Sequence, residues 1–169
     1  MATTAREQKT TDAGLEAQLV KHIDEAYAME HNVLRILDGM ISSTQDADMR
    51  RDLEHHRRET EHHAERLKER LDAHGATPSV IKEAGGFLGG LMKSVIDMAR
   101  PENPGRNARD GFATEHMEIA SYELLERVAN RAGDSETAGV ARENRKEERE
   151  MARKIAASWD KVADLSVES

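Results

Sequence analysis

Apolar side chains recur along much of the chain at alternating steps of three and four residues. In the first such stretch they are Leu19, Ile23, Ala26, Val33, Leu37 and Met40. This spacing places them on one face of an α-helix and predicts an amphipathic helix that packs against others. Thr11 or Asp12 is suited to cap its start, and the polar residues 42–46 are suited to end it and to cap the next helix.

Three further stretches show the same period. The second helix is predicted over residues 46–74, closed by Gly75 and Pro78, with the stripe Met49, Leu53, His56, Thr60, His63, Leu67 and Leu71. The third is predicted over residues 107–131, with the stripe Phe112, Glu115, Ile119, Tyr122 and Ala129. The fourth is predicted from Asp134 or Ser135 to about Asp164, with the stripe Val140, Asn144, Met151, Ile155, Trp159 and Val162.

The segment between the second and third helices has a different character. Residues 76–106 hold all three prolines and a glycine-rich run at 85–90, and residues 88–98 suit a short amphipathic helix. Two helix pairs joined by such a crossover predict an all-α, ferritin-like four-helix bundle, because a simple up-down bundle needs only short connections. We expect the bundle to span residues 12–165, with the crossover at 76–106 and a polar N-terminal tail at 1–11.

Composition excludes several classes of protein. The chain of 169 residues has no cysteine, so a disulfide scaffold, an iron–sulfur protein, a four-cysteine zinc site and a thiol enzyme are all excluded. With 33 acidic and 25 basic residues its formal charge is −8, which argues against nucleic-acid binding. No apolar run approaches the ~18 residues of a membrane span, and the polar N-terminus lacks the apolar core of a secretory signal. We therefore expect a soluble cytoplasmic protein.

Several carboxylates interrupt the apolar stripes where the pattern predicts core positions. Glu30 lies on the inward face of the first helix, and Glu59 flanks the second stripe one turn before His63. The third helix carries Glu115 and Glu118 on one side, and the fourth carries Glu148 in its stripe. In a chain without cysteine, such carboxylates and histidines are the strong metal ligands that remain.

Counting residues from the two hairpin turns gives independent support. Glu30 and Glu59 lie 14 and 15 residues from Thr44, and Glu118 and Glu148 each lie 15 residues from Gly133. At ~1.5 Å rise per residue all four fall at one level of the bundle. A single glutamate in so acidic a chain is more often on a solvated face. Four inward carboxylates at one level, however, would repel one another unless a cation neutralised them. They predict a dinuclear metal site.

These residues also carry a family resemblance. The segment Glu115–Tyr122 resembles the third-helix signature of the YciF/YciE family of bacterial ferritin-like proteins, which are related to rubrerythrin. Residues 59–67, 27–30 and 147–148 resemble its motifs on the other three helices, and the resemblance extends from about residue 15 to 160. It implies a homodimer of four-helix bundles with two carboxylate-bridged iron or manganese ions. The implied metal ligands are Glu30, Glu59, His63, Glu115, Glu118 and Glu148.

The sequence does not decide every ligand or the activity. His62 competes with His63, and Glu147 with Glu148, as the ligand on the second and fourth helices. The family commonly has an acidic residue one turn after the fourth-helix glutamate, where this chain has Ala152, so the second ion would be held more weakly or by Glu147. The resemblance implies oxidation of Fe(II), or reduction of peroxide or O2, in stress protection, with electrons from an external donor. A helical interaction or scaffold protein with a degenerate site, and metal buffering without turnover, are the competing functions.

Overall fold

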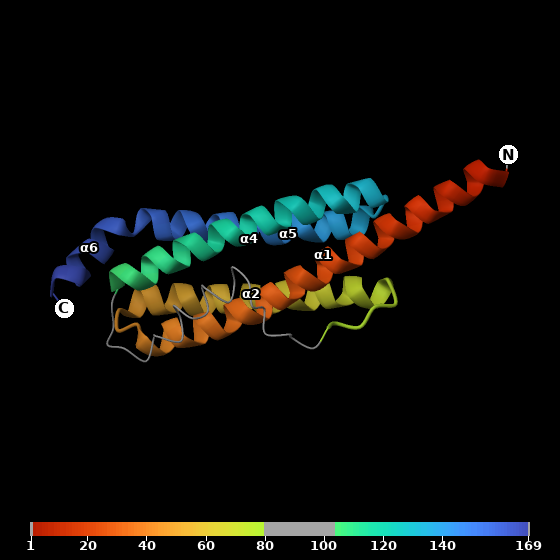
Figure 1. Cartoon of the computed structure of the whole chain (residues 1–169). Coiled ribbons are helices and arrows are strands. Elements are labelled where there is room, and N and C mark those ends of the chain that lie inside the picture. The colour runs from red at the N-terminus through yellow and green to blue at the C-terminus, as the bar shows by residue number, and fades with distance from the viewer. Residues whose placement is uncertain (1, 80–103, 169) are drawn as a thin grey trace.

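The computed structural model describes residues 2–79 and 104–168, with side chains from residue 13 onward, and this part of the chain contains helices and no strand. The helices are α1 (Ala2–Ser43), α2 (Ala47–Ala73), α4 (Pro104–Ala132), α5 (Ser135–Ala157) and α6 (Trp159–Glu168) (Figure 1). None of these helices combines the length and the apolar character that crossing a membrane requires.

Four of the helices form the bundle. The hairpin partners α1 and α2 pack along each other, as do α4 and α5, while α1 also packs on α4 and α2 on α5. The two hairpins lie side by side, and α2 runs in the same direction as α4 (Figure 1). A connection between two parallel helices must return along the whole bundle, which confirms the predicted ferritin-like four-helix connectivity. Most of that crossover, including the short helix expected at 88–98, lies outside the described residues.

Local sequence explains the two hairpin turns. Asp46 caps α2 by accepting hydrogen bonds from the backbone N–H groups of Asp48 and Met49, and Asp134 caps α5 in the same way. Gly75 and Gly133 follow the ends of α2 and α4 with φ angles of 65° and 78°. Only glycine adopts this left-handed conformation without steric cost, so both helices end where the sequence predicts.

Three boundaries differ from the predictions. α1 begins at Ala2, so the helix runs through the residues expected to form a tail, and α4 begins at Pro104 within the expected crossover. The fourth helix is interrupted at Ser158, whose N–H and hydroxyl both bond to the carbonyl of Ile155. These bonds replace the regular helical ladder, because a serine hydroxyl competes for backbone carbonyls. Trp159, expected in the stripe, is 38% exposed and contacts the Phe112 ring instead.

The core is divided into two apolar clusters. The larger contains Leu19, Ile23, Leu67, Tyr122 and Leu125, and the smaller contains Ala108, Met151, Ile155 and Val162. Buried glutamate and histidine side chains occupy the inward positions between them on all four helices. Both clusters consist of ordinary apolar packing, so the polar layer between them is the feature that requires a functional explanation.

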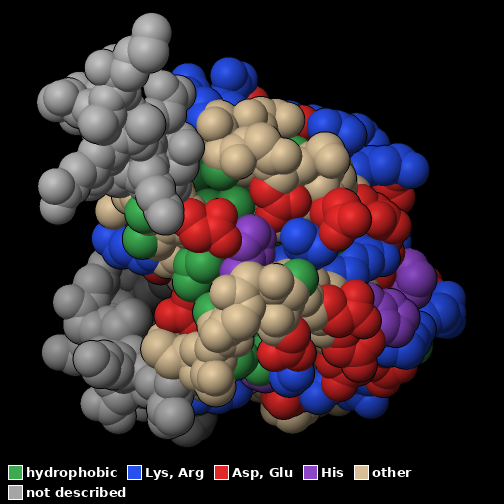
Figure 2. Space-filling view, turned by 90° about the vertical axis from the view of Figure 1, so that its right-hand side faces the viewer, with side chains coloured by type: hydrophobic (Ala, Val, Ile, Leu, Met, Phe, Trp, Pro, Cys, Tyr) green, Lys and Arg blue, Asp and Glu red, His purple; other side chains and the backbone are tan. Residues whose placement is uncertain are grey.

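The end of the bundle formed by the α4–α5 turn and the end of α2 is densely charged. Figure 2 shows acidic and basic side chains interspersed there, with histidine among them. His74 contacts Glu16 of α1 at 2.5 Å and Asp134 at the start of α5 at 2.8 Å. Arg70 bonds to Asp134, Glu136 and Thr137. We call His74 with Glu16 and Asp134 the terminal clamp, since it ties α1, α2 and α5 together at this end.

Candidate metal centre

The polar layer contains two overlapping groups of potential metal ligands. Glu30, His63 and Glu148 form the first, which we call the His63 group. His56, Glu115, Glu118 and Glu148 form the second, the His56 group. Within each group one ligand atom per residue lies within 4.8 Å of the others, and every member is buried. All four bundle helices contribute, which is the construction of a dinuclear carboxylate site.

Glu148 belongs to both groups, and its two oxygens point in different directions. Oε1 lies 2.8 Å from His63 Nδ1, whereas Oε2 lies 3.5 Å from His56 Nε2. Each imidazole nitrogen also lies near a second carboxylate. His63 Nδ1 is 3.6 Å from Glu30 Oε2, and His56 Nε2 is 3.3 Å from Glu115 Oε1. A carboxylate placed between two imidazoles in this way can bridge two ions ~3.5–4 Å apart.

The inward atoms of these side chains lack hydrogen-bond partners. They are Glu30 Oε2, His56 Nε2, His63 Nδ1, Glu115 Oε2 and both carboxylate oxygens of Glu118 and of Glu148. Buried polar atoms are normally paired, and a buried charge without compensation is strongly unfavourable. Even the close approach of His63 to Glu148 lacks hydrogen-bond geometry. Donor atoms that converge without bonding to one another fit a pair of bound cations.

The outward nitrogen of each imidazole, by contrast, has a carboxylate partner. His63 Nε2 lies 2.7 Å from Glu147, and His56 Nδ1 lies 3.4 Å from Glu59. A carboxylate that accepts the outer N–H fixes the tautomer of a histidine and leaves the inner nitrogen free to bind metal. Glu147 and Glu59 therefore have corresponding positions on the outside of the two groups.

A chain of hydrogen bonds surrounds the His63 group. The Tyr122 hydroxyl donates to Glu30 Oε1 and accepts from Asn144 Nδ2 at 3.0 Å. Arg66 donates to Asn144 Oδ1 at 2.8 Å and to Glu147 at 2.9 Å. Since Glu147 contacts His63, the chain of hydrogen bonds links Glu30 to His63, the two members of the group other than Glu148. Arg66 and Glu147 are each about a quarter exposed, so this chain also reaches the surface.

Burial and mutual repulsion shift the pKa values of the centre. Burial raises the pKa of Glu30, Glu118 and Glu148, and neighbouring carboxylates raise that of Glu118 further. Burial alone lowers the pKa of a histidine, but here the facing carboxylates outweigh it. They raise the pKa of His56 to about 10 and of His63 to about 12. Bonding to His63 and Arg66 lowers the pKa of the half-buried Glu147 to about 2 despite partial burial.

Charge counting fits two divalent ions. The two groups contain four buried glutamates and two histidines. Four ionised carboxylates carry a charge of −4, which two divalent cations balance if both imidazoles are neutral. Without the cations, protons are the available compensation, which agrees with the raised pKa values of Glu30, Glu118, Glu148 and the two imidazoles.

The structure brings five of the six predicted residues together: Glu30, His63, Glu115, Glu118 and Glu148. It leaves Glu59 outside both groups, against the expectation that Glu59 would lie with Glu30 and Glu148. The predicted position of Glu59 along α2 was nearly right. The inward face of α2, however, is occupied by His56, Thr60 and His63, which are fully buried. Glu59, one residue before Thr60, is rotated about 100° away from that face.

His56 is the ligand candidate that the sequence analysis missed. It was part of the predicted stripe, and a histidine at a core position seven residues before His63 lies on the same helix face. Burial favours His63 and Glu148 over their competing neighbours, since His62 is exposed and Glu147 is half-buried, whereas His63 and Glu148 are buried. Ala152 is buried and offers no ligand in place of the acidic residue common in the family, and the His56 group has a nitrogen donor from α2.

Comparison with known proteins agrees with this fold. The stress protein YciF of E. coli has 19% sequence identity and a TM-score of 0.79, over 89% of this chain and 97% of that one. YcfI from Rhodopseudomonas palustris has 26% identity and a TM-score of 0.73, over 84% and 92%. A Desulfovibrio desulfuricans bacterioferritin, itself described with a diiron site, has 18% identity and a TM-score of 0.74, over 92% and 85%.

A family model agrees with these likenesses. The model described as domain of unknown function (DUF892) matches residues 4–168, nearly the whole chain. The match and the YciF-like neighbours confirm the resemblance seen in the sequence. The chain therefore belongs to the DUF892 family and has a ferritin-like fold.

Proposed function

We propose that this protein binds two iron or manganese ions in the polar layer and uses them to oxidise Fe(II) with O2 or peroxide. The observation that carries the proposal is the pair of overlapping buried groups whose inward donor atoms have no other partner. A set of carboxylates with one imidazole per ion suits Fe(II) and Mn(II) among the divalent metals. Binding of two redox-active ions is therefore the function that this donor set supports best.

Each group would hold one ion. Glu30 and His63 would bind the first, His56, Glu115 and Glu118 the second, and Glu148 would bridge them. Glu59, expected as a ligand from the family resemblance, would instead orient His56, as Glu147 orients His63. His56 would also compensate for the acidic ligand that is missing at Ala152, because it gives the second ion a nitrogen ligand.

The reaction needs two electrons, which two ions can supply together. Bound as substrate, two Fe(II) would supply the electrons that reduce O2 to hydrogen peroxide, or peroxide to water, with uptake of two protons. The protein's part is to hold the ligands in place and to exclude bulk water from the layer, whose members are fully or almost fully buried. Repeated turnover would require further Fe(II) as substrate or, for ions that stay bound, an external electron donor. The bacterioferritin with its diiron site and the stress protein YciF support a role in stress protection.

Anaerobic titration of the metal-free protein with Fe(II), followed by addition of O2, tests the proposal. We expect two Fe(II) to bind per chain. When O2 is then mixed in, the change in optical absorbance should show that both ions are oxidised. Absence of bound metal would support a helical scaffold function and overturn the proposal. Binding of two ions that stay Fe(II) in the presence of both O2 and peroxide would leave buffering without turnover. Light scattering on the same sample tests the expected homodimer.

A further inference from the structure

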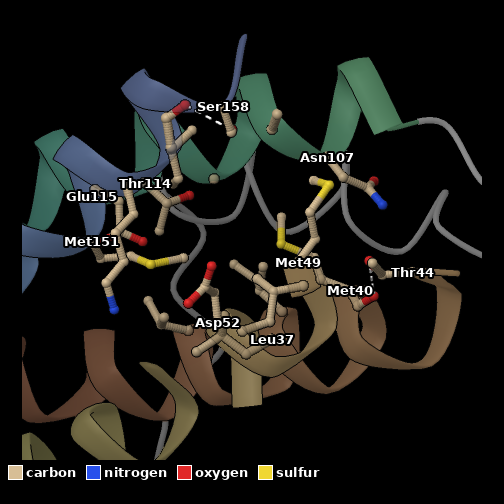
Figure 3. A pocket seen from close by; sticks show the side chains of 17 residues that line it. Leu37, Met40, Thr44, Met49, Asp52, Asn107, Thr114, Glu115, Met151 and Ser158 are labelled. Carbon is tan, nitrogen blue, oxygen red and sulfur yellow. Dashed lines mark hydrogen bonds between the residues drawn. The ribbon is translucent and has the colours of Figure 1, made fainter. Parts of the chain in front are cut away.

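An apolar cavity adjoins the His56 group at the end of the bundle away from the terminal clamp. Its volume is about 80 Å³, and all four bundle helices contribute to its wall. Met40 and Leu37 of α1 and Met49 of α2 lie on one side of it, and Met151 of α5 lies on the other (Figure 3). One water needs roughly 10–15 Å³, so the cavity has room for a small molecule.

Glu115 connects the cavity to the candidate metal centre. Its side chain lines the cavity while its Oε1 lies 3.3 Å from His56 Nε2 (Figure 3). Glu115 Oε2 is buried and has no hydrogen-bond partner. A molecule in the cavity would therefore lie directly beside a ligand of the His56 group, whereas the His63 group does not line this cavity.

The lining selects the kind of molecule. Methionine, leucine, isoleucine and valine side chains dominate, and the charged side chains besides Glu115 are the exposed Asp52 and Lys154. Apart from the carboxylates of Glu115 and Asp52, the wall offers a hydrated cation little in exchange for the water that it would lose. An apolar wall, by contrast, favours uncharged apolar molecules such as xenon or benzene. Thioether side chains are also flexible enough to adapt to an occupant.

We infer that this cavity binds dioxygen and holds it beside Glu115. Dioxygen is apolar, uncharged and small enough for the space, and it is the co-substrate that the neighbouring centre would consume. The role of the bound O2 rests on the proposed function, but its binding is a property of the cavity alone. The inference can therefore be tested on metal-free protein, where failure of one proposal does not imply failure of the other.

Methionine methyl groups provide the measurement. Dissolved O2 is paramagnetic and speeds the relaxation of nearby nuclei, so metal-free protein with ¹³C-labelled methionine methyls is examined under increasing O2 pressure. The methyls of Met40, Met49 and Met151 should relax faster than that of Met29, which is as buried as Met40 and Met151 but lines a different hollow of the bundle. Equal relaxation of Met29 and the three cavity methyls would overturn the inference.

Gly111 offers a way to fill the cavity. It lines the space, and a Cβ there would lie 3.6 Å from Ile155 Cδ1 and 3.9 Å from Met40 Cε, which is ordinary contact. Gly111→Leu should abolish the extra relaxation, and Gly111→Ala, which adds a single methyl, should reduce it with less risk to folding. Gly139→Ala is the matched control, since a Cβ there has no atom within 4 Å and Gly139 lies outside the cavity. Persistence of the effect in Gly111→Leu would contradict the inference.

A larger apolar molecule is the competing occupant. Titration with benzene tests it, because an organic substrate site should show saturable shifts at the same three methyls. Saturable benzene binding without any specific O2 effect would overturn the assignment to dioxygen. A specific O2 effect in protein that then fails to bind Fe(II) would uphold the cavity and remove the proposed function.

Discussion

The two groups of the candidate centre share Glu148 but differ in their surroundings. In the His63 group, Glu30 and His63 are tied to Tyr122, Asn144, Arg66 and Glu147 by a continuous set of hydrogen bonds. In the His56 group, Glu115 and Glu118 retain buried oxygens without partners, and the apolar cavity lies alongside. One group is held in place by its environment, whereas the other faces a space that a small molecule can enter.

This difference predicts a division of roles between the two groups in binding metal and O2. Ligands that are fixed in advance lose little conformational freedom when metal binds, so we expect the His63 group to bind its ion more tightly. The His56 group, with ligands less constrained by hydrogen bonds, is expected to be the side at which O2 arrives. Variants that affect one group and spare the other test this comparison.

Removing the shared carboxylate should have the largest effect, because it damages both groups. Glu148→Ala takes a ligand from each ion and eliminates the bridge, so we expect tight Fe(II) binding to fall from two ions per chain to none. Metal analysis after gel filtration and anaerobic calorimetry measure this. Glu150→Ala is the matched control, since Glu150 lies exposed on the same helix. Retention of two tightly bound ions by Glu148→Ala would show that the centre is wrongly placed.

Removing one imidazole should separate the two groups. We expect His63→Ala and His56→Ala each to bind one ion tightly instead of two, with the remaining ion held by the group that is still intact. The remaining ion should bind more tightly in His56→Ala than in His63→Ala, because the His63 group is the better organised. His62→Ala is the control, since His62 is exposed next to His63. The reverse order of affinities in calorimetry would contradict the proposed division.

The helical period was enough to predict the bundle and to place Glu30, His63, Glu115, Glu118 and Glu148 on inward faces, where the structure buries them. Helix ends with an acidic N-cap or a following glycine, such as Asp46 and Gly133, depend on local chemistry and were predicted correctly. Glu59 and His56 were assigned less well because a residue count gives the level along a helix but not its rotation about its own axis. That rotation is determined by packing across the whole bundle, which turns His56 and Thr60 inward and leaves Glu59 outside.

The unequal hydrogen bonding predicts opposite effects on the stability of the metal-free protein. Glu118→Leu removes a buried carboxylate without partners and should raise the free energy of unfolding by roughly 1–4 kcal/mol. Glu30→Leu should lower it by roughly 1–3 kcal/mol, because the buried Tyr122 hydroxyl then has no acceptor. Both glutamates are fully buried, so they form a matched pair. Urea unfolding of metal-free protein measures the two changes, and a shared sign would refute the contrast.

The outer carboxylates should have smaller and local effects. Glu147→Gln weakens the acceptor for the outer nitrogen of His63, and Glu59→Gln does the same for His56. Loss of such a partner typically lowers metal affinity ~10–100-fold. We expect the larger loss for Glu147→Gln, because its contact with His63 is 2.7 Å against 3.4 Å for Glu59 and His56. Glu61→Gln, a half-buried glutamate paired with Arg57, serves as the control.

The terminal clamp should give the smallest effect, and one that depends on pH. Burial lowers the pKa of His74, but Glu16 and Asp134 outweigh it and raise the pKa above its ordinary value of 6.5. Because the folded state then binds the proton more tightly, the stabilisation is complete below about pH 6. It is lost as the pH rises through the folded-state pKa.

His74→Gln should therefore lower the free energy of unfolding by about 1 kcal/mol or less at pH 6, the range for partly exposed ion pairs, and by less as the pH rises. Urea unfolding at a series of pH values measures this, with His55→Gln as an exposed-histidine control. The clamp joins α1, α2 and α5 beyond the apolar cluster that contains Tyr122, on the side of the His63 group. Any effect on metal affinity should accordingly be confined to that group and be weaker than that of Glu147→Gln. A constant loss of stability across the pH series would mean that His74 acts through packing and not through its charge.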